Sequence, residues 1–322
     1  MTGSAGERAT PAPPAPSHTL DVPAPAKVNL FLRVLGRRDD GYHELETLVA
    51  PVGLADRLRV HAFSDAEVFR SLSVTLELAG SRRDAAGVPL DESNLVLRAA
   101  AALSEAAGGV RGFAEFVLEK RVPVSAGLGG GSGDAAAALR ALNTLWNLDL
   151  GDEELARVGS AVGSDVPALL AGHPVVARGR GERIDAAAVA GLALVLVTFS
   201  FGVSTADAFG WWDEDGGQTG PDPAGALAAL RPGALRDGGD LASLATLLRN
   251  DLEKPVAGRH PAVREVKERL RHAGVAAAIM SGSGPTVVGI RSPDMRRLDA
   301  QAERDLERIA GRPVLYVDSE GS

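Results

Sequence analysis

The chain has 322 residues, of which 45% are hydrophobic and 24% are charged, as in a globular protein large enough for two domains. Lys and Arg number 34 against 42 Asp and Glu, a net charge of −8, and no basic tract predicts a nucleic acid or a membrane as partner. Cysteine is absent, which excludes disulfides, thiolate catalysis and thiolate zinc sites and is compatible with a cytoplasmic location.

The N-terminal region predicts a tail followed by a hairpin. Residues 1–19 are rich in Pro and Ala and lack the apolar centre of a signal peptide, so we expect a disordered tail. An apolar run at 28–35 and a polar turn at 36–41 then predict a strand and a hairpin. Lys27 and Asn29 share one face of this strand, because side chains two apart in a strand point the same way.

Strands and a helix are expected up to a glycine-rich stretch. Strands are predicted at 54–60, 72–78 and 113–118 and a helix at 96–107. Pro123 then prevents a helix from continuing into the glycines at 127–133, and four alanines at 135–138 begin a new helix.

This glycine-rich stretch predicts a phosphate-binding loop. Glycines without Cβ let backbone N–H groups close around phosphate oxygens, and the following helix adds partial positive charge. The stretch is not a P-loop, because no lysine stands between Gly131 and Ser132, and a dinucleotide fingerprint would need glycine where Ser132 stands. A flexible linker is the alternative, but linkers are seldom followed at once by so regular a helix.

The second half predicts an α+β layer. The apolar run within 192–201 is about half as long as a membrane-spanning helix and is interpreted as a buried strand. Residues 216–239, rich in Gly, Asp and Pro, are interpreted as a mobile insertion. Helices are expected at 153–162, 241–248, 263–271 and 295–309, and strands at 275–280, 286–290 and 314–317. The predicted fold class is α+β.

Three ordered motifs resemble those of the GHMP kinases, the superfamily named for galactokinase, homoserine kinase, mevalonate kinase and phosphomevalonate kinase. The sequence PAKVNL at 25–30 resembles the first motif, PVSAGLGGGSGDAA at 123–136 the second and SGSGPT at 281–286 the third. The resemblance implies an N-terminal ATP-binding domain at 20–182, a C-terminal α+β domain at 183–322 and an active site in the cleft between them. The third motif would support the phosphate loop.

The resemblance also implies a catalytic pair and an ATP site. Asp165 would be the base that faces the acceptor hydroxyl, and Lys27 would keep it ionised and orient that hydroxyl. Without the resemblance, Asp165 and Asn94 could equally be helix caps. The implied ATP-binding residues are Asn94, Lys120, Pro123, Gly127, Gly129, Gly130, Gly131, Ser132 and Gly133, with Ser132 also a candidate Mg²⁺ ligand. The family more often has Ser at Gly133 and Thr at Ser281.

The segment GRRDDGYHELETL at 36–48 narrows the resemblance to members whose acceptor carries cytidine diphosphate. It implies that Tyr42 stacks on the cytosine, that His43 hydrogen bonds to the base edge and that Phe209 offers a second aromatic face, with Trp211 and Trp212 as neighbouring alternatives. A phenol and an imidazole suit a pyrimidine, which needs a flat apolar partner and groups in its plane.

The implied acceptor is a small molecule, cytidine diphosphate-linked methylerythritol, phosphorylated on its 2-hydroxyl with ATP and Mg²⁺. Asn29 and Thr205 would complete its site. One alternative is a kinase of the homoserine or mevalonate type, which gives no reason for Tyr42 and His43. The other is a non-catalytic nucleotide-binding regulator on the same fold, against which Asp165 argues.

Overall fold

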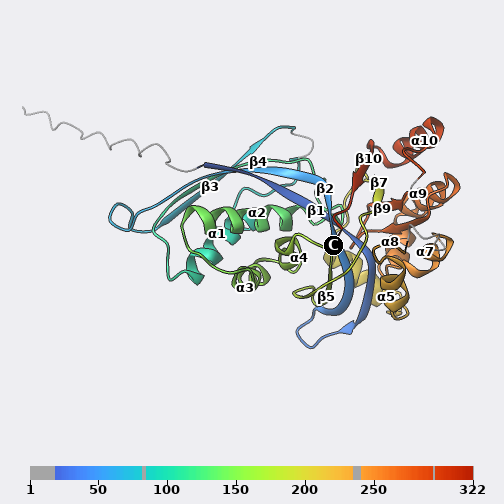
Figure 1. Ribbon diagram of the computed structural model, residues 1–322, viewed down its shortest axis with the longest axis horizontal. Helices are drawn as coiled ribbons and strands as arrows, with labels where there is room; N and C mark the ends of the chain where they lie inside the picture. Colours follow the sequence, from blue (N-terminus) through green and yellow to red (C-terminus); the bar gives the residue numbers. More distant parts are fainter. Residues whose placement is uncertain (1–18, 82–84, 235–240, 293, 322) are drawn as a thin grey trace, which may run out of the picture.

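The computed structural model describes residues 19–81, 85–234, 241–292 and 294–321. These residues form two sheets side by side, each with helices packed on it (Figure 1). Residues 1–18 of the tail predicted at 1–19 lie outside the described residues. Thr19, its last residue, belongs to the first strand.

The first sheet is built on one long antiparallel hairpin. Its strand order is β3-β4-β2-β5-β6, with β1 paired to β2. The strand expected at 54–60 is the second half of β2, and bulges in the β1–β2 register allow these long strands to bend. The strands are β1 (Thr19–Arg37), β2 (His43–Ser64), β3 (Leu72–Ala79), β4 (Gly112–Glu119), β5 (Val175–Gly179) and β6 (Arg183–Ala186).

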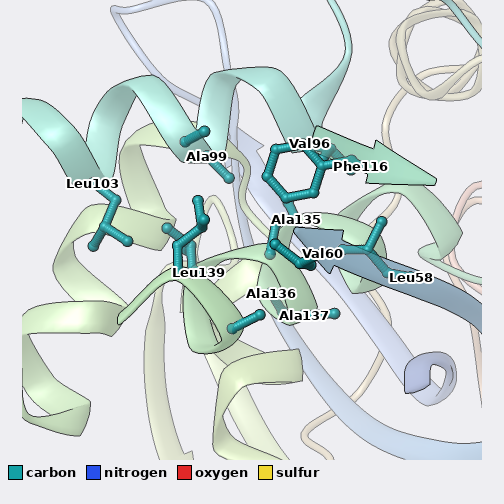
Figure 2. Packing of buried hydrophobic residues seen from close by; sticks show 14 of the residues in the cluster. Leu58, Val60, Val96, Ala99, Leu103, Phe116, Ala135, Ala136, Ala137 and Leu139 are labelled. Carbon is teal, nitrogen blue, oxygen red and sulfur yellow. The ribbon is translucent and has the colours of Figure 1, made fainter. Parts of the chain in front are cut away.

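Four helices pack on one side of this sheet (Figure 1): α1 (Leu95–Ala106), α2 (Gly130–Leu145), α3 (Asp152–Val162) and α4 (Val166–Ala171). Figure 2 shows Val96, Ala99 and Leu103 of α1, at helical spacing, facing Phe116 of β4 and the alanine-rich start of α2. All four of these residues are fully buried. The small alanines let α2 approach the sheet closely, which brings the glycine-rich loop before it to the sheet edge.

The second sheet has the order β10-β7-β9-β8. Its strands are β7 (Ala193–Val197), β8 (Ala277–Met280), β9 (Val287–Ile290) and β10 (Val314–Asp318). Its helices are α5 (Thr205–Glu214), α6 (Ala224–Ala229), α7 (Leu241–Leu247), α8 (Glu253–Arg259), α9 (Pro261–His272) and α10 (Ala300–Ala310). The predicted α+β class is confirmed. One buried cluster joins Leu30 and Leu48 of the first sheet to Leu194 and Ile279 of the second.

Two predictions about the second half are wrong. The helix expected at 295–309 begins at Ala300, because the side chain of Asp299 caps it by accepting hydrogen bonds from the next backbone N–H groups. The insertion expected to be mobile at 216–239 contains α6, whose Ala226 is buried, as is Leu230 after it, in the cluster shared by the two sheets. Within that insertion, residues 235–240 lie outside the described chain. No described helix is long and apolar enough to cross a membrane.

We expect Phe116→Ala to lower the free energy of unfolding by about 3–5 kcal/mol, because it leaves a cavity between α1, α2 and the sheet. Urea denaturation would measure this loss. Leu90→Ala is the matched control, since Leu90 is 57% exposed and should change stability by less than about 0.5 kcal/mol. Equal effects of the two substitutions would contradict the packing of Phe116 between α1, α2 and the sheet.

Candidate active site

A cavity of about 940 Å³ brings the three sequence motifs together. Of the predicted site residues, it is lined by Lys27, Asn29, Tyr42, His43, Asn94, Lys120, Pro123, Gly127, Gly129, Gly130, Gly131, Ser132, Asp165, Thr205 and Phe209. Gly133 is the one predicted site residue that does not line it. Among the other lining residues are Thr47, Asp134, Arg180 and Asp213, to which the sequence analysis assigned no role in the site.

The buried ammonium of Lys27 connects the first strand, the glycine-rich loop and Asp165. Its Nζ donates to Asn29 Oδ1 at 2.7 Å and to the Gly127 carbonyl at 3.3 Å, and lies 3.3 Å from Asp165 Oδ2. The Lys27 side chain is 4% exposed, whereas that of Asp165 is 37% exposed. The carboxylate therefore has one side against the lysine and another toward the cavity.

The side chain of Asn29 is used to hold Lys27. Its Oδ1 accepts from the lysine, and its Nδ2 donates to Thr47 Oγ1 at 2.8 Å. The Thr47 hydroxyl in turn donates to the Phe31 carbonyl at 2.6 Å. Asn29 and Thr47 thus fix the direction of the ammonium. Period-two spacing along β2 puts Thr47 on the face of His43, a signal from which it could have been found.

Two glycines of the loop have conformations that the site requires. Gly127 and Gly129 have φ values of +75° and +65°, in the left-handed region that favours glycine. A Cβ on Gly129 would lie 2.9 Å from Lys27 Cε, and one on Gly127 would lie 2.2 Å from the Ser281 carbonyl oxygen. Side chains here would displace the lysine and the third motif.

The start of α2 presents backbone donors to the cavity. The first N–H groups of a helix have no intrahelical acceptor, and residues 130–132 of α2 line the cavity. With the helix dipole they form a site suited to the phosphates of a nucleotide. Ser132 adds a hydroxyl at this point. No cluster of three or more His, Asp or Glu side chains in the described chain could hold a metal ion by itself.

Gly133 and Ser281 act behind the loop. A Cβ on Gly133 would lie 2.4 Å from the Pro25 carbonyl oxygen, so glycine allows α2 to pack against the first motif. The fully buried Ser281 accepts from Asn29 N at 3.1 Å and donates to the Gly127 carbonyl at 2.9 Å. The third motif therefore fastens the first two, as the resemblance implies.

Lys120 lies beneath the loop between two buried carboxylates. Its Nζ donates to Asp134 Oδ2 at 2.8 Å and to Asp56, and Asp56 also accepts from Val122 N at 2.8 Å. Within the part of the chain that the structure describes, Asp134 Oδ1 is buried without a hydrogen-bond partner. Burial raises the pKa of Asp134 to about 7; Lys120 opposes this rise, and the negative charge of Asp56 adds to it. No local pattern links these residues in the sequence.

Asn94 and Asp165 both stand at helix starts, but only one side chain caps its helix. Asn94 Oδ1 accepts from Val96 N at 2.8 Å, and its Nδ2 donates to the Pro89 carbonyl at 2.7 Å, so this residue caps α1. Asp165 precedes α4 without a side-chain cap hydrogen bond. Its carboxylate instead faces Lys27.

The residues predicted to bind the cytosine ring lie in another part of the cavity, away from Lys27 and Asp165. The His43 imidazole stacks on Phe209, with ring centroids 4.7 Å apart, and its Nε2 lies 2.9 Å from Asp213 Oδ1. Tyr42 is 55% exposed, and the Arg180 guanidinium lies 4.9 Å from its ring centroid. His43 and Phe209 are thus each other's partners here, an arrangement that sequence reasoning did not anticipate.

Comparison with known proteins places the chain among kinases. The family model "GHMP kinases N terminal domain" matches residues 94–173, and "GHMP kinases C terminal" matches residues 226–304. A 4-diphosphocytidyl-2-C-methyl-D-erythritol kinase from Moorella thermoacetica is 43% identical over 279 residues, which cover 84% of this chain and 90% of that protein.

Solved structures agree with this relationship. A crystal structure of 4-(cytidine 5'-diphospho)-2C-methyl-D-erythritol kinase is 36% identical, with a TM-score of 0.71 over 94% of this chain and 100% of that one. Homoserine kinase from Cytophaga hutchinsonii is 18% identical with a TM-score of 0.66, covering 94% of this chain and 95% of that one. At this lower identity the likeness concerns the fold alone.

We expect Asp134→Asn to change how stability depends on pH. Because the folded-state pKa of Asp134 is raised from 3.8 to about 7, the folded protein retains a proton that the unfolded chain releases between these values. The stabilisation from this group is complete below about pH 4 and is lost as the pH rises toward 7. Asparagine does not titrate, so the variant should gain stability relative to wild type across this window, by up to about 1.4 kcal/mol per pH unit.

Urea denaturation at several pH values across the window would measure this difference. Asp152→Asn is the control, because this substitution removes the same charge from a side chain that is 92% exposed. A difference between Asp134→Asn and wild type that stayed constant with pH would show that Asp134 does not titrate in this range.

Proposed function

Because the chain belongs to the family of 4-diphosphocytidyl-2-C-methyl-D-erythritol kinases, we propose that it transfers the terminal phosphoryl group of ATP to the 2-hydroxyl of 4-diphosphocytidyl-2-C-methyl-D-erythritol. The products are the 2-phosphate and ADP, and the reaction belongs to the methylerythritol phosphate route to isoprenoids. The observation that carries the proposal is one cavity that joins the Lys27–Asp165 pair to the glycine-rich loop and to the aromatic site around His43.

In this proposal the loop and the start of α2 bind the triphosphate. Backbone N–H groups of residues 130–132 have no intrahelical acceptors, and the absence of side chains on the glycines leaves space for phosphate oxygens. Lys120 lies directly beneath the glycine-rich loop, since a Cβ on Gly130 would lie only 3.3 Å from its Nζ. Its two carboxylate partners keep that lysine in place, so its part is to support the loop.

The chemical step requires removal of a proton from the acceptor hydroxyl. Asp165 takes this proton as the new O–P bond forms and the bond between the γ-phosphorus and the bridging oxygen breaks, so that ADP leaves. A positioned base typically contributes about 10²–10⁴-fold, and much of the remaining acceleration comes from positioning and charge neutralisation. Lys27, held by Asn29 and Gly127, keeps the carboxylate and the hydroxyl aligned.

The residues that line the cavity suit a magnesium ion that is bound mainly through the phosphates of the nucleotide. Mg²⁺ usually keeps several waters and uses one or two protein ligands together with substrate phosphates. Ser132 is the protein ligand that we propose, because its hydroxyl is at the start of α2 and lines the cavity. When bound, the ion would neutralise charge on the phosphates.

The cytidine end of the acceptor would lie against Tyr42, His43 and Phe209. An aromatic group offers a base-stacking surface, and an imidazole nitrogen offers a hydrogen bond in the plane of the base. Thr205 at the start of α5 lines the same cavity. The methylerythritol end then extends toward Lys27 and Asp165.

We expect Asp165→Asn to lower turnover by about 10² or more, since an amide keeps the shape of the side chain but takes no proton. ATP affinity, measured by calorimetry, should stay near that of wild type. Asp152→Asn removes the same charge at an exposed site of the same half and should leave turnover unchanged. A near-normal steady-state rate in Asp165→Asn would remove this residue from the mechanism.

The acceptor is tested with a panel in a coupled assay for ADP. We expect phosphorylation of the cytidine diphosphate-linked acceptor and little or none of methylerythritol 4-phosphate, homoserine or mevalonate at equal concentration. Phe209→Ala should raise the KM for the acceptor far more than that for ATP, because stacking contributes about 1–3 kcal/mol per base. If homoserine or mevalonate were the best acceptor, the cytidine site would be refuted and only kinase activity would remain.

A further inference from the structure

One face of α5 encloses the His43 imidazole. Phe209 stacks on it at an interplanar angle of 21°, and Trp212 meets its edge with ring centroids 5.7 Å apart. Asp213 follows Phe209 by four residues and therefore points from the same side of the helix. Two aromatic rings and one carboxylate thus fix both the plane of the imidazole and its rotation.

The carboxylate also decides which ring nitrogen carries hydrogen. Asp213 Oδ1 lies 2.9 Å from His43 Nε2, and a carboxylate oxygen can only accept, so Nε2 is the donor. The other carboxylate oxygen, Oδ2, lies 3.8 Å from Arg37 Nη1, which holds the group from its far side. Nδ1 of His43 forms no hydrogen bond with any part of the chain that the structure describes, although His43 lines the cavity.

We propose that Asp213 is a positioning residue that holds the hydrogen of His43 on Nε2, so that Nδ1 presents a lone pair to the base of the acceptor and selects an amino group over a carbonyl. This inference rests on the proposed function, because it assumes that a pyrimidine nucleotide is bound beside His43. It adds a residue, Asp213, that acts on specificity only through His43.

The discrimination follows from the chemistry of the two pyrimidines. Cytosine carries an amino donor at the position where uracil carries a carbonyl acceptor. A lone pair on Nδ1 accepts from the amino group, whereas it faces the carbonyl oxygen with no hydrogen between them. A buried polar group left unpaired in this way disfavours the wrong ligand. The site should therefore prefer a cytidine-linked acceptor to its uridine counterpart.

Replacing Asp213 by asparagine would remove this control and change little else in shape. An amide can turn either its oxygen or its nitrogen toward Nε2, so it pairs with both neutral forms of the imidazole. In the second form Nδ1 carries the hydrogen and can donate to the carbonyl of uracil. The preference for cytidine should then fall by about tenfold or more, which corresponds to the loss of one hydrogen bond to a partly buried group.

The test compares kcat/KM for the cytidine diphosphate-linked and uridine diphosphate-linked acceptors in wild type, Asp213→Asn and Asp213→Glu. We expect a strong cytidine preference in wild type, at least a tenfold smaller preference in Asp213→Asn and partial recovery in Asp213→Glu, with the KM for ATP unchanged throughout. Glu214→Gln is the matched control, because the adjacent Glu214 pairs with Arg259 away from the cavity. It should keep the wild-type preference.

A second readout does not depend on turnover. Nitrogen-15 chemical shifts of the imidazole, assigned with His43→Gln, should show hydrogen on Nε2 in wild type and a mixture of the two forms in Asp213→Asn. An unchanged cytidine preference in folded Asp213→Asn, or hydrogen on Nδ1 in wild type, would overturn the assignment. A wild-type chain that phosphorylated neither acceptor would overturn the proposed function and this inference with it.

Discussion

The arrangement of the site depends on the partners of one buried cation. The Lys27 side chain is 4% exposed, and so deeply buried an ammonium is costly to desolvate unless it is paired and hydrogen bonded. Its partners are the Asn29 amide, the Gly127 carbonyl and the Asp165 carboxylate, which come from three separate segments of the chain. The left-handed Gly129 leaves room for the lysine stem. The loop conformation and the direction of the proposed base therefore follow from the same contacts.

The second half of the molecule contributes to this centre through its loops. Asn250 donates from Nδ2 to the carbonyls of Met280 and Gly282 at 2.7 and 2.8 Å, which holds the third motif in place. That motif reaches Asn29 and Gly127 through Ser281. Because both sheets also share one hydrophobic cluster, the position of the cavity is set by packing as well as by these hydrogen bonds. Substitutions in either half can then alter the same site.

Sequence reasoning found what is encoded locally. The glycine-rich loop, the alanine-rich helix after it and the residues Lys27 and Asp165 each belong to a short readable pattern, and the structure brings them together. It missed Asp56 and Asp134, because their pairing with Lys120 depends on contacts between distant segments. The burial of α6 is likewise a tertiary effect, which its Gly- and Pro-rich surroundings concealed. Asp213 could have been found, since it follows Phe209 at helical spacing.

The decisive measurement is a structure of the ternary complex with the cytidine diphosphate-linked acceptor and a non-hydrolysable ATP analogue. We expect the 2-hydroxyl to lie within about 3 Å of the Asp165 carboxylate, which is the reach of a general base. We also expect the Lys27 ammonium beside that hydroxyl and the γ-phosphate on the N–H groups of residues 130–132. A hydroxyl bound away from Asp165, or phosphates bound away from the start of α2, would contradict the proposed mechanism.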